Sequence, residues 1–209
     1  MKTIIFMLLL IPSLAHALLV GELGLMTSFT STDFTETSAT PGKHSGSFSP
    51  GIGFEGRFGF EFPIVTLGAI GLIDWESSLT RYQPDNKTLF SSTTYSNTRR
   101  RIAFGPTAMA TLPFFNLRLV GEYFIHVQDT FTYAKPKGEN PFSEKDEIKG
   151  DGYGVGIGYK MLGFYFQATY RKFVYKKGKI GGSSTADLPS SSYSKIDTSG
   201  MYLSIGVSI

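Results

Sequence analysis

The stretch GMYLSIGVSI, residues 200–209, decides how the rest of the chain is interpreted. Every second residue in it is apolar, namely Met201, Leu203, Ile205, Val207 and Ile209. The residues between them are small or polar, namely Gly200, Tyr202, Ser204, Gly206 and Ser208. Side chains that alternate with a period of two lie on opposite faces of a β-strand. In a soluble sandwich such a strand would leave an apolar edge, whereas closure into a membrane-spanning barrel gives it lipid outside and a polar interior.

Residues 1–17 have the three parts of a secretory signal peptide. Lys2 is a basic tip, residues 4–11 form a short apolar core, and Ala15-His16-Ala17 is a small-residue ending. We expect cleavage after Ala17, which leaves residues 18–209 as one outer-membrane barrel domain. A retained helical anchor is the disfavoured alternative, because the apolar run is too short to cross a bilayer.

The composition narrows the class of protein further. The chain has no cysteine, so neither a lipid-modified cysteine nor a disulfide-stapled domain is an option. Its 24 glycines and 14% aromatic residues suit crowded strands in contact with lipid, and charged residues make up only 18%. The net charge of +3 does not argue for a nucleic-acid partner, and we expect none. We also expect no cofactor and no metal.

The alternation recurs in eight segments, at residues 19–29, 51–62, 65–81, 101–112, 117–128, 152–159, 164–174 and 200–209. The connections between them alternate from long to short. Polar loops span 30–50, 82–97, 135–149 and 176–195, while tight turns lie at Pro63, at Pro113 and at 161–163. This order predicts an all-β, eight-stranded antiparallel up-and-down barrel with short periplasmic turns and long outer loops.

Two segments contain unusual residues. Pro106 falls inside the fourth segment and predicts a bulge or a locally unpaired position, since proline cannot donate to a strand ladder. In residues 152–159 every inward position is glycine. These glycines leave room for a large side chain that reaches across the lumen.

This pattern resembles the small eight-stranded outer-membrane barrels, the group that includes the OmpA membrane domain and the OmpX/Ail-type proteins. The resemblance covers essentially all of residues 18–209 and rests on alternation and topology. It implies localisation in the outer membrane of a Gram-negative bacterium, with outer-membrane lipid, lipopolysaccharide and the barrel insertion machinery as partners. The sorting signal of this group commonly ends in Phe, whereas this sequence ends Val207-Ser208-Ile209.

Charged residues collect at the inward positions of the expected strands. We predict that they form an ion-pair network in the lumen, because an unpaired buried charge costs several kcal/mol. The network consists of Glu22, Glu55, Arg57, Glu61, Asp74, Glu76, Arg101, Arg118, Glu122, Lys160 and Arg171. An eight-stranded barrel is just wide enough for side chains to fill it, so the lumen is expected to be plugged. The alternative is a narrow porin-like path along Glu122, Arg118 and His126.

Four outward aromatic residues are expected at the edges of the apolar band, where rings with a polar end are enriched. They are Trp75, Tyr153, Tyr159 and Tyr170.

A lipid-modifying enzyme is the third hypothesis. Lipid A deacylases and outer-membrane phospholipases place a Ser and a His on the lipid-facing wall. Here the His-x-Ser signature of the deacylases is absent, His126 is expected to point inward, and His44 lies in a Gly/Ser loop. We therefore expect no catalysis, and a structural or surface-interaction role through the outer loops. Lysines at the rim could pair with lipopolysaccharide phosphates, namely Lys135, Lys137, Lys176, Lys177 and Lys179.

Overall fold

The computed structural model describes residues 18–36, 42–46, 49–84, 93–112, 115–133, 145–179, 186–187 and 193–209. The expected signal peptide and the central parts of the outer loops lie outside these ranges. The strands are β1 (Leu18–Glu36), β2 (Gly42–Gly46), β3 (Ser49–Glu61), β4 (Val65–Pro84), β5 (Thr93–Leu112), β6 (Leu117–Tyr133), β7 (Lys145–Met161), β8 (Phe164–Lys179), β9 (Ala186–Asp187) and β10 (Tyr193–Ser208).

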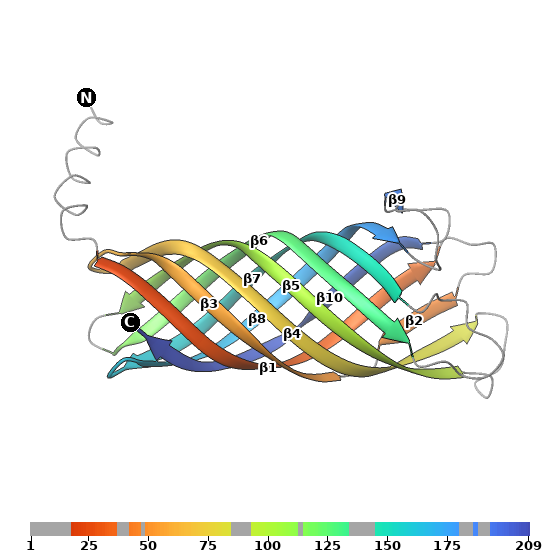
Figure 1. Ribbon diagram of the computed structural model, residues 1–209, viewed down its shortest axis with the longest axis horizontal. Coiled ribbons are helices and arrows are strands. Elements are labelled where there is room, and N and C mark those ends of the chain that lie inside the picture. The colour runs from red at the N-terminus through yellow and green to blue at the C-terminus, as the bar shows by residue number, and fades with distance from the viewer. Residues whose placement is uncertain are drawn as a thin grey trace, which may run out of the picture.

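The strands close into an eight-stranded antiparallel barrel, which confirms the predicted fold. β2 and β3 both lie between β1 and β4 and share one place in the wall, while β9 is a two-residue appendage to β8. Closure comes from β10, which pairs with β8 on one side and with β1 on the other. Ile209 completes the seam by exchanging two backbone hydrogen bonds with Gly21, at 2.8 and 2.9 Å. In Figure 1 the start of β1 and the end of β10 lie at the same end of the barrel as the short turns.

Several strands run further than the alternation predicted. β4 and β5 have 20 residues each, although a tilted strand needs only about 9–11 to cross a bilayer. They take in both ends of the expected loop 82–97, and β7, β8 and β10 likewise enter the expected loops 135–149 and 176–195. Backbone pairing continues where the outward face turns polar, because Thr and Tyr suit strands in water as well as in lipid.

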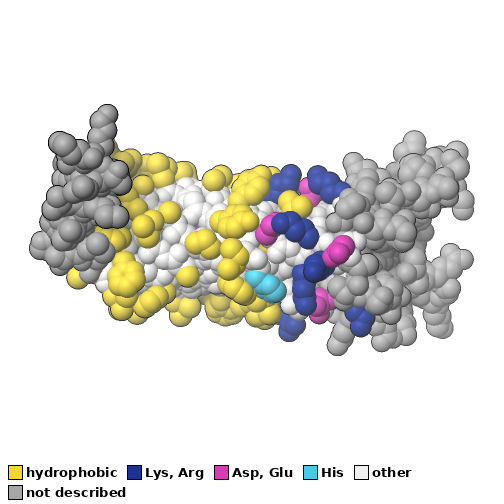
Figure 2. Space-filling model, turned by 90° about the horizontal axis from the view of Figure 1, so that it is seen from above, with side chains coloured by type: hydrophobic (Ala, Val, Ile, Leu, Met, Phe, Trp, Pro, Cys, Tyr) yellow, Lys and Arg dark blue, Asp and Glu magenta, His cyan; other side chains and the backbone are white. Residues whose placement is uncertain are grey.

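The outward faces of the strands form a continuous apolar belt. Phe54, Phe58, Phe60 and Phe166 are 48–58% exposed, so these rings do not pack into a central core. Figure 2 shows hydrophobic side chains distributed over the part of one face nearer the short turns and charged side chains gathered between them and the loop end. No helix in the described ranges has the length and apolar character needed to span a bilayer.

The turn between β7 and β8 has the geometry expected of a tight hairpin. Leu162 and Gly163 both have positive φ, 49° and 81°, and they join the paired residues Met161 and Phe164. Two consecutive positive φ values suit the right-handed twist of the flanking strands. The predicted turn at 161–163 is therefore confirmed.

The register between β5 and β6 shifts at the predicted proline. Phe104 pairs with His126 but Thr107 pairs with Glu122, so β6 carries one extra residue opposite Pro106. The same extra residue shifts the β6–β7 register between Phe124 and Val127. A bulge of this kind exchanges the two faces of the strand beyond it.

Because of the bulge, three side chains of β6 face the opposite way from the prediction. Val127, expected to face outward, is fully buried, and His126 and Gln128, expected to face inward, are half-buried on the other face. His126 stacks on the outward Phe104, with ring centroids 5.0 Å apart. The predicted porin-like path along Glu122, Arg118 and His126 is therefore wrong, because His126 does not lie in the lumen.

Candidate functional site: the charged lumen

Six charged residues form a cluster in the half of the lumen nearer the short turns. This turn-side cluster contains as many acidic as basic side chains, namely Glu22, Glu55, Arg57, Arg118, Glu122 and Arg171. Alternation on β1, β3, β6 and β8 turns all six inward, and each is at most 5% exposed. The sequence predicted every one of them as a lumen residue.

Four members of the turn-side cluster form a closed ring of charge-assisted hydrogen bonds. Arg171 donates through Nε to Glu122 Oε2 and through Nη2 to Glu55 Oε2, both at 2.7 Å. Arg57 completes the ring, donating to Glu55 Oε1 at 2.8 Å and to Glu122 Oε1 at 2.9 Å. Each carboxylate in the ring thus bridges two guanidinium groups. Such short bonds between ionised partners are the strong ones in a low-dielectric interior.

Arg118 and Glu22 extend the ring toward the short turns. Arg118 Nη2 donates to Glu22 Oε1 at 2.6 Å, and Arg57 Nη1 lies 3.7 Å from Glu22 Oε2. Tyr165 covers this side, with its ring 5.7 Å from the Arg57 guanidinium carbon. The gap lined by Val20, Glu22, Arg57 and Met109 is too small for a water molecule.

A second group, the loop-side cluster, lies further along the strands. It consists of Asp74, Glu76, Arg99, Arg101 and Asp129, all of them 4% exposed or less. Arg101 clamps Asp129 with two hydrogen bonds, Nε to Oδ1 at 2.9 Å and Nη2 to Oδ2 at 2.6 Å. Arg99 pairs with Glu76.

Hydroxyl groups donate further hydrogen bonds to two carboxylates of the loop-side cluster, Glu76 and Asp129. Glu76 accepts hydrogen bonds from Ser28 at 2.8 Å and from Thr30 at 2.7 Å. Tyr175 donates to Asp129 at 2.5 Å, and Arg101 donates to the Tyr202 hydroxyl. These two carboxylates are thereby held in fixed geometries.

The predicted network did not include Arg99 and Asp129. Asp129 lies beyond the bulge in β6, where the parity of inward positions is reversed, and the predicted segment ended at Gln128. Arg99 lies just outside the predicted segment 101–112, in the part of β5 that extends past the expected boundary. The signal that could have found Asp129 was Pro106, because the bulge it implies reverses the alternation.

Asp74 is the exception within the loop-side cluster. Its side chain is 1% exposed, and neither carboxylate oxygen has a hydrogen-bond partner among the described residues. Arg101 lies opposite Asp74 in the β4–β5 register, but its guanidinium is turned to Asp129. The loop-side cluster therefore has three carboxylates for two guanidinium groups.

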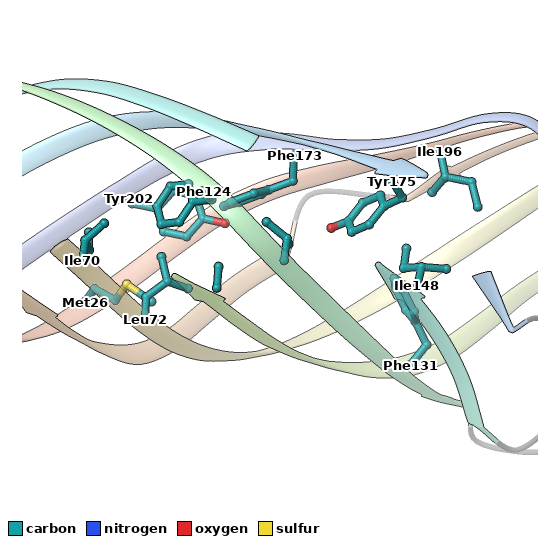
Figure 3. Packing of buried hydrophobic residues seen from close by; sticks show 12 residues of the cluster. Met26, Ile70, Leu72, Phe124, Phe131, Ile148, Phe173, Tyr175, Ile196 and Tyr202 are labelled. Carbon is teal, nitrogen blue, oxygen red and sulfur yellow. The ribbon is translucent and has the colours of Figure 1, made fainter. Parts of the chain in front are cut away.

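Apolar and aromatic side chains fill the lumen between and beside the two clusters. Figure 3 shows Phe124, Phe173 and Tyr202 close together, with Met26, Ile70 and Leu72 facing them. The rings also cover the cations: the Arg101 guanidinium carbon lies 4.1 Å from the centroid of Phe173, and that of Arg171 lies 4.7 Å from the centroid of Tyr202. We expected the side chains that face the lumen to be small or polar. That expectation was incomplete, because Ile, Leu and Phe side chains also face inward.

The two other predicted lumen residues lie at the end with the short turns. Lys160 Nζ is 3.5 Å from Glu61 Oε2, and both side chains are about one-third exposed. The pair is thus separated from the buried clusters. It lies in water, where such a pair stabilises little.

The four predicted interfacial aromatic residues all face outward. Trp75, Tyr153, Tyr159 and Tyr170 are 39–48% exposed. Tyr123 lies directly opposite Tyr153 on the same outer face, and the predicted set did not include it. Their depth in a bilayer stays a prediction.

Charged side chains on the outer faces of β7, β8 and β10 lie on the loop side of the apolar belt. Asp197 accepts from Lys195 at 2.8 Å and lies 3.5 Å from Lys172, while Lys176 pairs with Asp151. The hydrogen bonds that Lys176 donates to Asp151 and Lys195 donates to Asp197 raise the pKa of both lysines above the ordinary lysine value. Lys177 lies 3.8 Å from Asp187, whereas Lys135, Lys137 and His44 lie outside the residues whose side chains are described.

The chemical groups of the lumen are charged side chains that ion pairs and hydrogen bonds hold in fixed positions. In the described part of the chain, no group of three or more His, Asp or Glu residues is arranged to hold a metal ion. Within the two clusters, every charged residue except Asp74 has a hydrogen bond or ion pair with a partner of opposite charge among the described residues.

The closed antiparallel wall and its apolar belt decide what kind of protein this is, because strands cross lipid only when every edge is paired. The protein is an integral membrane barrel of the outer-membrane type. No protein-family model matches the sequence, and a search of curated proteins also finds no match.

Several solved structures are similar to this barrel. One is Ail, the attachment invasion locus protein of Yersinia pestis, solved with the heparin analogue sucrose octasulfate; it is 14% identical over 90% of this chain and 99% of its own, with a TM-score of 0.47. Another is the outer-membrane protease OmpT from Escherichia coli, 9% identical over 91% of this chain and 95% of its own, with a TM-score of 0.44. A third is the translocator domain of the autotransporter NalP from Neisseria meningitidis, 11% identical over 90% of this chain and 88% of its own, with a TM-score of 0.30.

Proposed function

We propose that this protein is a plugged barrel of the outer membrane with a structural or surface-interaction role and no catalysis. The observation that carries the proposal is the closed ring of Arg57, Glu55, Arg171 and Glu122, which joins three strands across the lumen. An ion or solute would have to break this ring to pass. A buried charge without a partner costs several kcal/mol, so spontaneous opening of the ring is rare.

The proposed partners follow from the position of the charged groups. The insertion machinery and the surrounding lipid are partners of any barrel in this membrane. Lys172, Lys176 and Lys195 lie above the apolar belt, at the height where lipopolysaccharide phosphates would be reached. A surface partner would bind through the outer loops, which the same strands carry.

Planar-bilayer recording tests the plug. We expect the refolded protein to give no discrete conductance steps, while a general porin refolded in the same way gives them. Insertion is checked separately by protection of the wall from added protease. Discrete steps from inserted wild-type protein would contradict the proposed plug.

A narrow channel is the second candidate, and one observation favours it. Asp74 is a buried carboxylate with no hydrogen-bond partner among the described residues, as expected of a group that exchanges a proton or a cation. The same recording tests this candidate, because a channel of this kind should lose its cation selectivity in Asp74→Asn.

A lipid-modifying enzyme is the third candidate, favoured by the outward orientation of His126. An enzyme acting on bilayer lipid would need a base on the outer wall. Mass spectrometry of lipid A and phospholipids incubated with the refolded protein should show no released or transferred acyl chain. If activity were found, its loss in His126→Ala would assign it to this side chain.

A further inference from the structure

The outer wall has an apolar groove close to the short turns. It runs across β7, β8 and β10, reaches the first residue of β6, and has a volume of about 380 Å³. Ala168 lies in its middle, paired with Ile157 on one neighbouring strand and with Leu203 on the other. Phe166 and Tyr159, which also pair with each other, line the end nearer the turn at 162–163. One small side chain between four large ones produces the hollow.

The position of the groove determines which kind of molecule it can take. Ile157, Phe166 and Leu203 are 44–58% exposed and belong to the belt that faces hydrocarbon. The exposed lining is almost wholly apolar, so it offers nothing to a headgroup or a polar solute. The groove is continuous with the lipid-facing surface, which makes a hydrocarbon chain the fitting occupant.

The strand ends show the depth of the groove. Leu117 is the first residue of β6, Phe166 is the third residue of β8, and Tyr159 lies two residues before the end of β7. All of them are therefore next to the short turns, which are periplasmic in barrels of this type. The leaflet on that side of an outer membrane consists of glycerophospholipids. The Tyr159 ring lies where an interfacial aromatic residue meets the headgroups.

We propose that this groove is a binding site for one acyl chain of a glycerophospholipid of the periplasmic leaflet, an inference that rests on the proposed membrane location. Free bilayer is as apolar as the groove, so burial from water contributes nothing to this binding. The stabilisation comes from close dispersion contacts with Ile157, Phe166 and Leu203 around the chain, each small and additive only where the shapes fit. Filling the hollow should therefore abolish the site without disturbing the fold.

Native mass spectrometry of protein extracted from membranes in mild detergent tests the site. We expect wild-type barrels to retain one phospholipid, and Ala168→Phe to lower that occupancy about tenfold, a loss of ~1.4 kcal/mol. Ala69→Phe makes the same replacement on β4, outside the groove lining, and should retain lipid as the wild type does. Ala168→Leu is a smaller filling variant for use if the phenylalanine variant does not fold.

Each other outcome overturns the inference. Equal retention by wild type, Ala168→Phe and Ala69→Phe would show that the lipid is a general annulus. Retention of lipid A in place of phospholipid would exclude the periplasmic leaflet. A protein that stays folded in water without detergent would instead contradict the membrane location, so failure of that proposal is distinguishable from failure of the site.

Discussion

Asp74 and Glu122 are both carboxylates buried in the lumen, yet their surroundings differ completely. Glu122 accepts hydrogen bonds from two guanidinium groups, while the Asp74 oxygens accept none from the described residues. A buried polar group without partners keeps its full desolvation cost of about 1–3 kcal/mol, and more when it is charged. Burial alone therefore does not say whether a lumen charge stabilises the barrel.

This contrast predicts opposite effects of two apolar replacements. Asp74→Leu should raise the free energy of unfolding by about 1–3 kcal/mol, because it removes an unpartnered carboxylate. Glu122→Met should lower it by about 3–5 kcal/mol, because it leaves Arg57 and Arg171 short of a partner. Urea unfolding in lipid vesicles, followed by far-UV circular dichroism, measures both. Equal destabilisation by the two variants would mean that Asp74 does make a stabilising interaction.

At the scale of the element, the inward glycines of β7 provide space for the partners of the ring. A Cβ added at Gly154 would lie 2.6 Å from Glu122 Oε2 and 3.1 Å from Arg171 Cγ. The Glu122 carboxylate is held by Arg171 at 2.7 Å and cannot move away without losing that bond. The glycine run thus has the role that the sequence suggested, which is to make room for large side chains.

Gly154→Ala should therefore lower the free energy of unfolding by about 1–3 kcal/mol, the usual cost of overpacking. Gly121→Ala is the matched control on β6, since a Cβ there meets only the Ala108 carbonyl oxygen, at 3.8 Å. The control should stay within about 0.5 kcal/mol of wild type in the same unfolding assay. A harmless Gly154→Ala would show that the ring adapts to smaller spaces than the structure provides.

The bulge in β6 shows how one residue changes an element. Without it, Val127, Asp129 and Phe131 would face outward, and the Arg101–Asp129 clamp could not form. Pro106 lies opposite this bulge and has no backbone N–H to offer β6. The predicted irregularity was confirmed, but which strand carries the extra residue depends on pairing with β7 as well.

At the scale of the whole molecule, the single Trp75 reports how the barrel sits in the bilayer. Its ring faces outward and makes an edge-to-face contact with Phe54, with ring centroids 6.5 Å apart. Trp75 pairs with Arg100 on the neighbouring strand β5. Trp75 therefore belongs to the loop-side edge of the apolar belt. We expect bromines near the lipid carbonyls to quench its fluorescence more strongly than bromines at the chain ends.

The control for this depth measurement moves the fluorophore within the wall. In Trp75→Phe combined with Phe58→Trp, the indole lies in the middle part of the outward face of β3, and the order of quenching should reverse. Identical profiles for the two proteins would mean that the belt is not aligned with the bilayer as the strands indicate.

Alternation along the chain by itself determined the barrel, its strand order, its outward belt and the six residues of the turn-side cluster. The reason is that period-two patterning assigns each side chain to one face of the wall, and connection lengths assign each strand to its neighbours. Only the tertiary structure decided which charges pair, that Asp74 has no hydrogen-bond partner among the described residues, and that Asp129 replaces His126 inside the lumen. Those outcomes depend on register across strands far apart in sequence, and a one-residue bulge, which local pattern cannot count, shifts that register.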